Sequence, residues 1–542
     1  MSGTAQINDA AVEPRNRSWW DLPTRIACLV GAAGLIYRAA LIALGVPPTN
    51  SDEATMGLAA LHISRGEDFP VFFYGQSYMG TIEAYLAAPM FWLFGPSTVA
   101  LRLPMLLCYL VFVVGMFALS RLIVGPWPAV VTIAVLALGS DRVIKNQLIA
   151  AGGYPEISPG AVWLILLAAL LGVGVLRPRR WILTLWGAVA GLLFWTHWLI
   201  LPYLAAAAAV LFLALRRSRG QGRGRPAWVL LGFIVGAAPL LWHDLTSPLA
   251  ESSLAVFLGQ SDPGDAASVA ARMSGGVLFG IPMGVGVCSP GRCEPWQVAW
   301  AIPYLALLAA AGVLAVRGIR RSDSDQFRNV VRLALVLAAV VSIVAYARSS
   351  AAAATPVESA RYLSPLLIST PVVLWPLWRL TARLVAADDS RWRRRRRWAA
   401  VVPSAALLST MAVATFGLML HVPTVRAVEA RRDLLAAHLV QTGVSEVYAD
   451  YWTCNRLTFA TRERVRCAVL NDDLTPGLDR YLPNRQAVAS ADRPAYVAPT
   501  HHALDDRLRA WLAGAGLSHQ VTTVGDHHVY LPDQPHTRPT SP

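Results

Sequence analysis

Long apolar runs recur through most of this chain, for example at Ala161–Val175, Leu201–Leu215 and Val330–Ala347. Each run is long enough, or nearly so, to cross a hydrocarbon core about 30 Å thick. Charged residues make up only 15% of the sequence, and a soluble protein of 542 residues would carry more. The sequence therefore predicts a polytopic α-helical membrane protein.

Clusters of arginine separate the apolar runs and account for much of the net charge of +14. They lie at Arg177–Arg180, Arg216–Arg225, Arg317–Arg321 and Arg391–Arg397. This is the positive-inside pattern, which sets the orientation of the chain in a membrane and argues against a nucleic-acid partner. Arginine and alanine dominate and Lys145 is the only lysine, which is typical of a high-GC bacterial genome. We therefore expect a multi-pass protein of a bacterial plasma membrane.

Placing the arginine clusters in the cytoplasm predicts about eleven transmembrane helices, with the N-terminus inside and the C-terminus outside. A cytoplasmic tail, 1–24, precedes the transmembrane region, 25–421, which contains two long external loops, 47–97 and 243–297. The predicted spans are Arg25–Val46, Thr98–Ser120, Pro126–Gly139, Ile157–Leu176, Trp181–Phe194, Ile200–Leu215, Trp228–Leu241, Val298–Val316, Val330–Ala347, Tyr362–Leu380 and Trp398–Leu420.

Residues 422–532 have the composition of an ordinary soluble protein and predict a small extracytoplasmic α/β domain. The last ten residues, 533–542, are rich in proline and threonine and predict disorder. The expected helices are Arg426–Leu439 and Leu504–Ala513, and the expected strands are Val444–Ala449, Arg466–Leu470, Pro494–Val497 and His528–Leu531.

Four cysteines fall outside the membrane in this topology, as two close pairs. Because disulfides persist in extracytoplasmic compartments, we expect bridges between Cys288 and Cys293 and between Cys454 and Cys467. Metal binding is the weaker alternative, since neither pair has a histidine or a second CxxC motif beside it.

The acidic pair Asp52-Glu53 follows the first apolar run directly, at the start of the first external loop. Charges beside a bilayer are costly, so such a pair is either harmlessly solvated or functional. A helix is predicted at Ala54–Ser64, and Ser51 or Asp52 would cap it. Capping is therefore the alternative to a functional role.

The same loop continues with an aromatic and amide-rich segment that contains Tyr74, Gln76 and Tyr78. Rings and amides of this kind suit both a membrane interface and a sugar-binding site. Glu83 follows on an apolar helix, and Arg102 stands at the external entrance of the second span. An arginine on that side either snorkels or meets an anion.

Taken in order, these motifs resemble the GT-C superfamily of membrane glycosyltransferases. The similarity is closest to the branch of bacterial enzymes related to protein O-mannosyltransferases and aminoarabinose transferases. It is scattered over most of the chain. The motifs that carry it are Asp52-Glu53, Tyr74-Gly75-Gln76, Phe94-Gly95 with Leu101–Pro104, Gly152–Glu156, Glu358–Pro365, and Tyr448–Trp452 with Arg456–Phe459.

The resemblance implies transfer of a sugar from a polyprenyl-phosphate donor to the hydroxyl of an extracytoplasmic glycan, lipid, protein or secreted metabolite. By position in the motif, Asp52 is the general base, with Glu53 as its support or deputy, and Glu156 is a second acid. Tyr74, Gln76, Tyr78 and Glu83 are expected to line the substrate site. The attack is expected to invert the anomeric centre.

The departing phosphate needs cationic partners. Arg361 is the first choice, because arginine matches phosphate bidentately, and Tyr362 would donate a hydrogen bond. Arg102, together with Arg142 or Lys145, is the second choice.

A divalent metal ion is an open question at this stage. Some GT-C enzymes use one, and Asp52, Glu156 and either His62 or His197 would supply suitable ligand types. For His197, an ordinary hydrogen-bonded role is the favoured alternative.

Two other functions compete with transfer. A transporter or flippase of a lipid-linked or glycan substrate would need polar residues part-way through its spans, and the sequence has no clear set of them. A catalytically silent GT-C-like scaffold would keep the fold but not the chemistry. The nature of the sugar and of the acceptor stays open.

Overall fold

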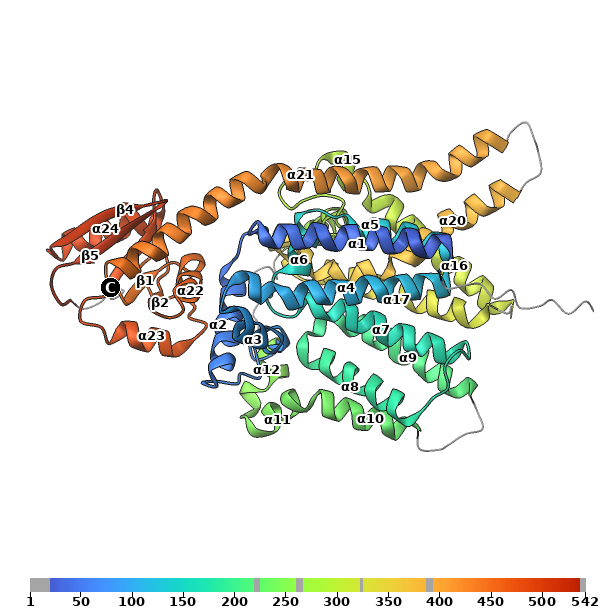
Figure 1. Cartoon of the computed structure of the whole chain (residues 1–542), viewed down its shortest axis with the longest axis horizontal. Helices are drawn as coiled ribbons and strands as arrows, with labels where there is room; N and C mark the ends of the chain where they lie inside the picture. The colour runs from blue at the N-terminus through green and yellow to red at the C-terminus, as the bar shows by residue number, and fades with distance from the viewer. Residues whose placement is uncertain (1–19, 219–224, 260–266, 322–324, 387–392, 537–542) are drawn as a thin grey trace, which may run out of the picture.

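A bundle of long helices forms most of the protein, and a small sheet-containing domain stands at one end of it (Figure 1). The structure is a computed structural model that describes residues 20–218, 225–259, 267–321, 325–386 and 393–536. The predicted N-terminal tail, 1–24, and C-terminal tail, 533–542, lie mostly outside the described residues.

Eight helical segments of the described chain are long and apolar enough to cross a membrane, and two sharply bent helix pairs raise the number to ten. One pair, α5 (Pro126–Ala137) and α6 (Asp141–Leu148), is bent by 89°, and the other, α10 (Arg225–Gly236) and α11 (Ala238–Thr246), is bent by 66°. Together with α8 (Arg180–Thr196), a shorter apolar helix, these segments correspond to the predicted spans, so the chain is a multi-pass membrane protein. The eight segments contain α1 (Leu22–Ala43), α4 (Thr98–Ile123), α7 (Tyr154–Gly172), α9 (Leu201–Arg217), α16 (Ala301–Arg320), α17 (Gln326–Arg348), α20 (Thr370–Ala386) and α21 (Arg393–Gln441).

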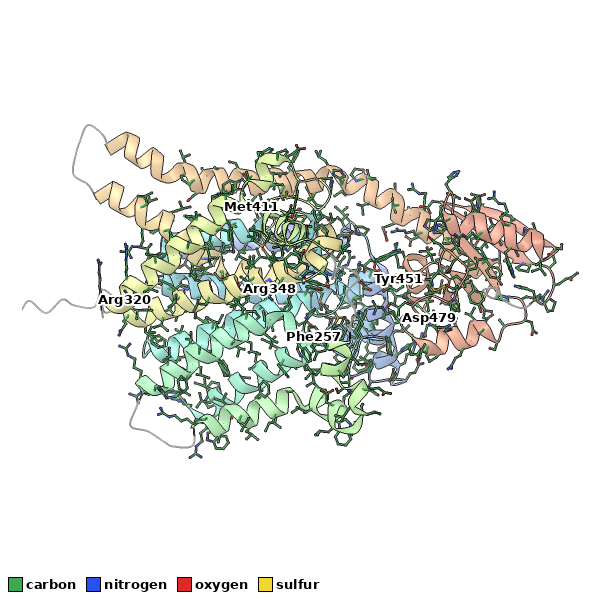
Figure 2. The ribbon with its side chains drawn as sticks, turned by 180° about the vertical axis from the view of Figure 1, so that it is seen from behind. Phe257, Arg320, Arg348, Met411, Tyr451 and Asp479 are labelled. Carbon is green, nitrogen blue, oxygen red and sulfur yellow. A yellow bond between two sulfur atoms is a disulfide. The ribbon has the colours of Figure 1, made fainter. Side chains whose placement is uncertain are left out.

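The arginine-rich helix ends and the C-terminal domain lie at opposite ends of the bundle. Figure 2 shows Arg320, the last residue of α16, at one end, and Tyr451 and Asp479 at the other. The basic end of α9, at Arg216 and Arg217, also lies away from the C-terminal domain (Figure 1). This separation is what the positive-inside pattern requires, and the cytoplasmic assignment of the basic end stays a prediction.

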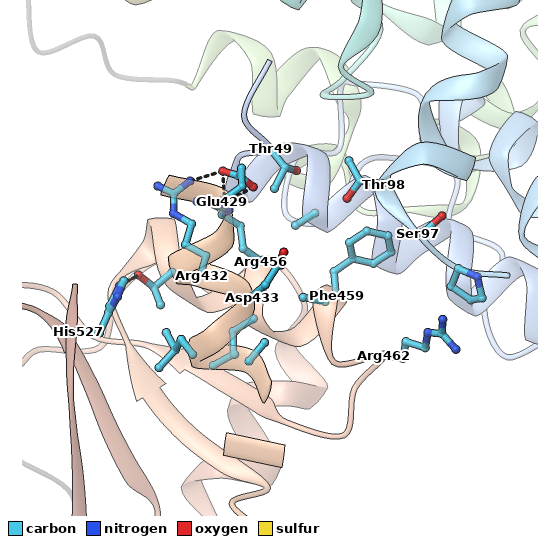
Figure 3. Close-up of a pocket in the computed structure, with 17 residues that line it drawn as sticks. Thr49, Ser97, Thr98, Glu429, Arg432, Asp433, Arg456, Phe459, Arg462 and His527 are labelled. Atoms are coloured by element: carbon cyan, nitrogen blue, oxygen red, sulfur yellow. Dashed lines mark hydrogen bonds and ion pairs between the residues drawn. The ribbon is translucent and has the colours of Figure 1, made fainter. Parts of the chain in front are cut away.

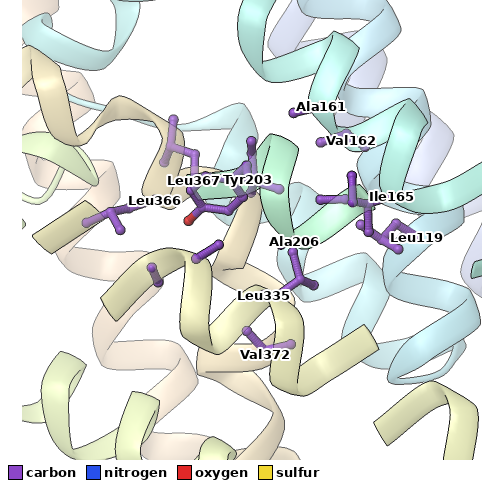
Figure 4. Close-up of a cluster of buried hydrophobic side chains, with 14 of the residues drawn as sticks. Leu119, Ala161, Val162, Ile165, Tyr203, Ala206, Leu335, Leu366, Leu367 and Val372 are labelled. Atoms are coloured by element: carbon purple, nitrogen blue, oxygen red, sulfur yellow. The ribbon is translucent and has the colours of Figure 1, made fainter. Parts of the chain in front are cut away.

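The core of the bundle is almost entirely aliphatic, and it packs side chains from α4, α7, α9 and α17 with those of the 3-10 helix η4 (Ala360–Ser369) (Figure 4). Tyr203 is one of the few polar members of this core. Its hydroxyl lies 2.8 Å from Oγ of Ser369, which in turn donates to the carbonyl of Leu335. This pairing satisfies polar groups that have no water within reach.

Helices α8 and α10 pack backbone against backbone through glycines. A Cβ atom added to Gly187 would lie 2.1 Å from the carbonyl oxygen of Val229, and one added to Gly232 would lie 2.0 Å from that of Thr184. Small residues four apart allow this close approach between helices in a membrane. Gly191 and Gly236 continue the same contact one turn further along.

Gly232→Ala is therefore expected to destabilise the protein by about 1–3 kcal/mol, because the added methyl group meets backbone that cannot move aside. Gly417→Ala in α21 is the matched control, since a Cβ atom there has no neighbour within 4 Å. Thermal unfolding of the purified proteins in detergent measures both. Equal melting temperatures would contradict the close packing.

The C-terminal domain is built on a five-stranded sheet in the order β2-β1-β3-β5-β4. The strands β1, β2 and β3 are parallel, and β5 pairs antiparallel with both β3 and β4. The strands are β1 (Glu446–Ala449), β2 (Arg466–Val469), β3 (Ala495–Pro499), β4 (His519–Val524) and β5 (His527–Pro532), and the helices are α22 (Tyr451–Ala460), α23 (Leu482–Ala489) and α24 (Ala503–Gly514).

The structure corrects the predicted layout of this region in two respects. The expected helix Arg426–Leu439 is the last part of α21, which runs unbroken for 49 residues, so the boundary placed at residue 422 falls inside a helix. Two helices, α22 and α23, and the edge strand β4 were not predicted. The four predicted strands and the helix at Leu504–Ala513 are present, with small shifts of their ends.

Both predicted disulfides are present in the structure. Cys454 on α22 is bonded to Cys467 on β2, and Cys288 is bonded to Cys293 in the second long loop. That loop is largely helical where it is described, and contains η2 (Leu249–Glu251), α12 (Ser253–Leu258), α13 (Val269–Met273), η3 (Ser274–Phe279), α14 (Gly280–Gly284) and α15 (Pro295–Val298).

The first long loop forms two helices, α2 (Ser51–Arg65) and α3 (Ile82–Phe94), at the end of the bundle next to the C-terminal domain (Figure 1). Helix α22 docks on α2, and the ring of Phe459 fills the space above Gly57, where a Cβ atom would lie 2.6 Å from the ring. The C-terminal domain is thereby seated on the helix that begins with the acidic pair.

Candidate active site at the junction of the bundle and the C-terminal domain

The first turn of α2 sends its two acids in different directions, because successive helix residues are about 100° apart. The helix is capped by Asn50, whose side chain accepts the backbone N–H of Glu53 at 2.8 Å. The expectation that Ser51 or Asp52 caps it is wrong. Ser51 instead donates to the backbone carbonyl of Tyr451 at 2.7 Å. Because Asn50 is the cap, the carboxylate of Asp52 is available for other contacts.

Glu53 is fully buried and forms a bidentate ion pair with Arg102 of α4. Nε and Nη2 of Arg102 donate to its two carboxylate oxygens, each at 2.7 Å, and the hydroxyl of Thr49 donates to it at 2.6 Å. Arg102 therefore does meet an anion, but that anion belongs to the protein. Glu53 and Arg102 hold α2 against α4, and we propose neither of them as a reacting group.

Asp52 is held by two side chains of the C-terminal domain. The phenol of Tyr451 donates to its Oδ1 at 2.6 Å, and Nη2 of Arg480 donates to the same oxygen at 3.3 Å. Nε of Arg480 also donates to the Tyr451 hydroxyl at 2.9 Å, and its guanidinium lies over the ring of Phe73. Within the described chain, Oδ2 of Asp52 has no hydrogen bond.

Burial, together with the neighbouring Asp52 carboxylate, raises the pKa of Tyr451 to about 12. The phenol is therefore protonated at physiological pH and serves as a permanent donor to Oδ1. With Oδ1 fixed in this way, Oδ2 is the oxygen that is free to accept a proton or a hydrogen bond from a ligand. No role was predicted from the sequence for either Tyr451 or Arg480.

Three cations form a group of which one, Arg361, reaches Asp52. Arg142 and Lys145 lie on α6, Arg361 lies on η4, and their charges act on one another. Arg361 lies close enough to Asp52 for the two charges to interact, and its guanidinium lies 5.7 Å from the ring centre of Tyr154.

Among the described residues, none of the three cations forms an ion pair with a protein carboxylate. Nε of Arg142 and Nε of Arg361 are buried without a hydrogen-bond partner. Such a group of like charges is costly unless an anion joins it. The arrangement therefore has the charge to accept an anion, and Arg361 joins it to the carboxylate of Asp52.

Two further acids, Glu83 on α3 and Glu156 on α7, form a buried pair nearby. The backbone N–H of Gly152 donates to Oε2 of Glu83 at 2.8 Å, from a turn in which Gly152 and Gly153 both have positive φ. Burial first, and then the adjacent Glu156, raise the pKa of Glu83 well above its ordinary value. Burial therefore favours the protonated form of Glu83 over its charged form.

This proton makes the stability of the protein depend on pH. The unfolded chain releases it above about pH 4.5, and the folded chain releases it only at a higher pH, so stability falls as pH rises from the first pKa to the second. Glu83→Gln keeps an acceptor for Gly152 but has no proton to lose. The unfolding free energy of this variant should therefore fall less between pH 5 and pH 8 than that of the wild type, by up to about 1.4 kcal/mol per pH unit. Melting temperatures measured across this pH range check the difference. Glu67→Gln, at an exposed acid, is the control and should follow the wild type.

The aromatic segment divides between two roles. Tyr74 packs against the C-terminal domain, since its ring lies 4.8 Å from that of Tyr481 and its hydroxyl donates to Asp68 at 2.7 Å. Tyr78 contacts the ring of Phe257 and is close enough to Tyr154 to act on its phenol electrostatically. The site-lining role predicted for Tyr78 therefore stays in our proposal, whereas Tyr74 is assigned to the domain contact.

Gln76 and Tyr362 contact residues close to them in the sequence. Gln76 sits in the turn of this segment, where its backbone N–H donates to the carbonyl of Phe73. Tyr362 lies next to Arg361, with its ring centre 5.7 Å from that guanidinium.

The ligand set suggested for a divalent ion is not assembled in the structure. In the described part of the chain, the only group of three potential ligands is His62, Glu67 and Glu463, with their ligand atoms within 4.8 Å. Nη1 of Arg65 lies 2.7 Å from Glu463 and 3.6 Å from Glu67, so a protein cation already balances that group. We therefore derive no catalytic step through a metal ion.

His197, the other candidate ligand, accepts the backbone N–H of Leu199 through Nδ1 at 3.1 Å. It thereby caps the short 3-10 helix η1 (Trp198–Ile200). This is the hydrogen-bonded role favoured as its alternative.

Solved structures of membrane enzymes resemble this chain over nearly its whole length. ArnT from Cupriavidus metallidurans in the apo state aligns with 94% of this chain and 98% of its own, with a TM-score of 0.58 at 16% identity. The chain therefore shares the fold of this enzyme, which is GT-C-like. ArnT bound to undecaprenyl phosphate gives a TM-score of 0.57 at 14% identity over the same shares of the two chains.

The oligosaccharyltransferase of Archaeoglobus fulgidus, in its apo form, gives a TM-score of 0.52 at 11% identity and covers 89% of this chain and 70% of that one. No protein-family model and no curated protein matches the sequence. At these identities the similarity shows the fold, and membership of the GT-C superfamily and of a branch within it stays a prediction.

Proposed function

We propose that this protein is a membrane glycosyltransferase that moves a sugar from a polyprenyl-phosphate donor to the hydroxyl of an extracytoplasmic acceptor, in a bacterial plasma membrane. The observation that carries the proposal is a carboxylate with one fixed and one free oxygen, within reach of Arg361 and its group of three cations, on a GT-C-like fold. The ArnT structure with undecaprenyl phosphate supports a polyprenyl phosphate as the lipid carrier.

The proposed reaction is a single displacement at the anomeric carbon. Oδ2 of Asp52 takes the proton of the acceptor hydroxyl while the hydroxyl oxygen bonds to the anomeric carbon. The bond from the anomeric carbon to the phosphate oxygen breaks, and the oxygen leaves with the electron pair. Attack opposite to the phosphate inverts the anomeric centre.

The cations act on the charge that develops on the leaving phosphate. Arg361 is the first of them, because its planar guanidinium can engage two phosphate oxygens, and Arg142 and Lys145 supply further positive charge. Tyr362 would donate a hydrogen bond to the same group. Arg102 takes no part, since Glu53 already engages it.

The C-terminal domain has a direct part in this proposal. Tyr451 and Arg480 are positioning residues that fix one oxygen of the base, so the domain has to be seated on α2 for the site to be complete. The acceptor would approach between the domain and the bundle, where Tyr78 offers a ring for sugar stacking.

Deletion of the gene followed by profiling of extracytoplasmic lipids, glycans and proteins tests the function and identifies the product. The expected result is the loss of one defined sugar, restored by the wild-type chain. Purified protein incubated with polyprenyl-phosphate mannose or arabinose and the unmodified acceptor should then release polyprenyl phosphate. A deletion strain with an unchanged profile would contradict the proposal.

A further inference from the structure

A cavity of about 270 Å³ lies between α22, the last part of α21 and the start of α4 (Figure 3). Thr453, Arg456 and Ala460 of α22 line it, and at about 100° per residue they centre on the helix face opposite to Tyr451. Its other walls are the end of α21 next to the C-terminal domain, the turn between α3 and α4, and the start of α2, where Thr49 and Ala54 flank the acidic pair. A single water takes up about 30 Å³, so this space is far larger than a packing defect.

The cavity offers both unpaired donors and an unpaired acceptor. Glu429 accepts from Arg432 at 2.6 Å and from Nη2 of Arg456 at 3.0 Å, but Nε of Arg456 is buried without a partner. Arg462 stands exposed at the rim. Asp433 has no hydrogen bond or ion pair within the described part of the chain. A ligand that carries both an anion and a cation would satisfy these groups together.

The mouth of the cavity lies at the first residues of the candidate span α4. Ser97 and Thr98 line it at the start of span α4, and the flanking Phe94 and Val99 are exposed. On the α21 side, Leu434 follows Asp433 and is also exposed. Exposed apolar side chains next to a charged cavity at this level match the boundary between lipid headgroups and acyl chains.

We propose that this cavity binds the headgroup of a phospholipid that carries a phosphodiester and a primary ammonium, as phosphatidylethanolamine does. Arg456 and Arg462 bind the phosphate, Asp433 binds the ammonium, and the acyl chains lie against Phe94 and Leu434. The bound lipid joins α4, α21 and α22, so it holds the C-terminal domain to the membrane surface.

The charges and the apolar flank decide between this lipid and other ligands. An anionic headgroup without the ammonium would leave Asp433 unpaired and would face two carboxylates, Asp433 and Glu429. A soluble sugar has no acyl chain to cover the exposed side chains of Phe94 and Leu434. The site therefore favours phosphatidylethanolamine over phosphatidylglycerol, and over free glycosides.

Thermal unfolding of the delipidated full-length protein in detergent, titrated with short-chain phosphatidylethanolamine, tests the proposal. The expected result is a saturable rise in melting temperature, with at least a tenfold weaker midpoint for short-chain phosphatidylglycerol. Asp433→Asn and Arg462→Gln should each weaken the phosphatidylethanolamine midpoint about tenfold, the value of one charged contact worth about 1.4 kcal/mol. Both residues are exposed, so neither change removes a buried pair.

Arg507→Gln, at an exposed position of α24, is the matched control and should titrate as the wild type does. The proposal is overturned if phosphatidylethanolamine gives no saturable shift in melting temperature, or if phosphatidylglycerol binds as tightly. It is also overturned if both cavity variants titrate like the wild type. A shift with methyl glycosides and none with the lipid would overturn it as well. Asp52→Asn should still bind the lipid. This keeps the test independent of the proposed sugar transfer.

Discussion

Replacing Asp52 with asparagine is expected to lower the turnover of sugar transfer by about 10²–10⁴-fold, the usual contribution of a general base. Asparagine still accepts hydrogen bonds from Tyr451 and Arg480 through its carbonyl, so the domain contact should persist. What the variant loses is the ability to take a proton from the acceptor hydroxyl. Initial rates with a labelled polyprenyl-phosphate sugar, over a range of donor concentrations, measure the effect.

The expected pattern is a loss of kcat with the KM for the donor changed by no more than a few-fold, because the donor phosphate is bound by the cations. Asp68→Asn is the matched control. Asp68 also accepts a tyrosine hydroxyl at the domain contact, from Tyr74 at 2.7 Å, but it has no place in the proposed chemistry. Asp52→Asn membranes that transfer sugar at the wild-type rate would show that another group is the base, or that the reaction needs none.

The membrane part of this fold could be predicted because its signals are local in the sequence. An apolar run predicts its own span, and an arginine cluster marks the end of that span. The bend between α5 and α6 could not be read in the same way. It depends on Arg38, a fully buried residue of α1 that donates to the carbonyls of Leu136 and Ala137. That contact joins residues about a hundred positions apart.

The candidate site likewise combines features that the local sequence predicts with features that depend on contacts between distant residues. Position alone pointed to the acidic pair, but it could not tell which acid faces the protein and which faces the ligand. Only the packing of α2 against α4, which brings Arg102 to Glu53, separates the two. Arg480 lies in a loop with no periodic signal, 428 residues beyond Asp52, and nothing in its neighbourhood pointed to the site.

Helix α22 was missed for a different reason. Its sequence, from Tyr451 to Ala460, contains tyrosine, tryptophan, threonine, cysteine and asparagine, which are weak helix formers. Asp450 caps it, accepting the backbone N–H of Trp452 at 2.8 Å, and the helix is stabilised by its packing on α2 and by the disulfide at Cys454. Tertiary contacts outweigh propensity here.

Replacing Glu53 with glutamine is expected to destabilise the folded protein by about 3–5 kcal/mol, because it leaves the Arg102 guanidinium buried without a counter-charge. The two side chains are 0% and 1% exposed and share two hydrogen bonds, so water cannot take the place of the carboxylate. Thermal unfolding of purified protein, together with the yield of monodisperse material, measures the loss. Arg102→Met should cost a similar amount, and the double variant should cost less than the sum of the two single changes.

Arg121→Gln provides the comparison. Arg121 and Asp21 form an ion pair at 2.9 Å whose side chains are 16% and 28% exposed, so its loss should cost about 1 kcal/mol or less. The decisive measurement is the transfer rate per folded molecule. If Glu53 only holds α2 in place, the folded fraction of Glu53→Gln keeps a rate far above that of Asp52→Asn. A Glu53→Gln protein that melts like the wild type but transfers no sugar would mean that Glu53 takes part in the chemistry and that the buried ion pair is not what retains it.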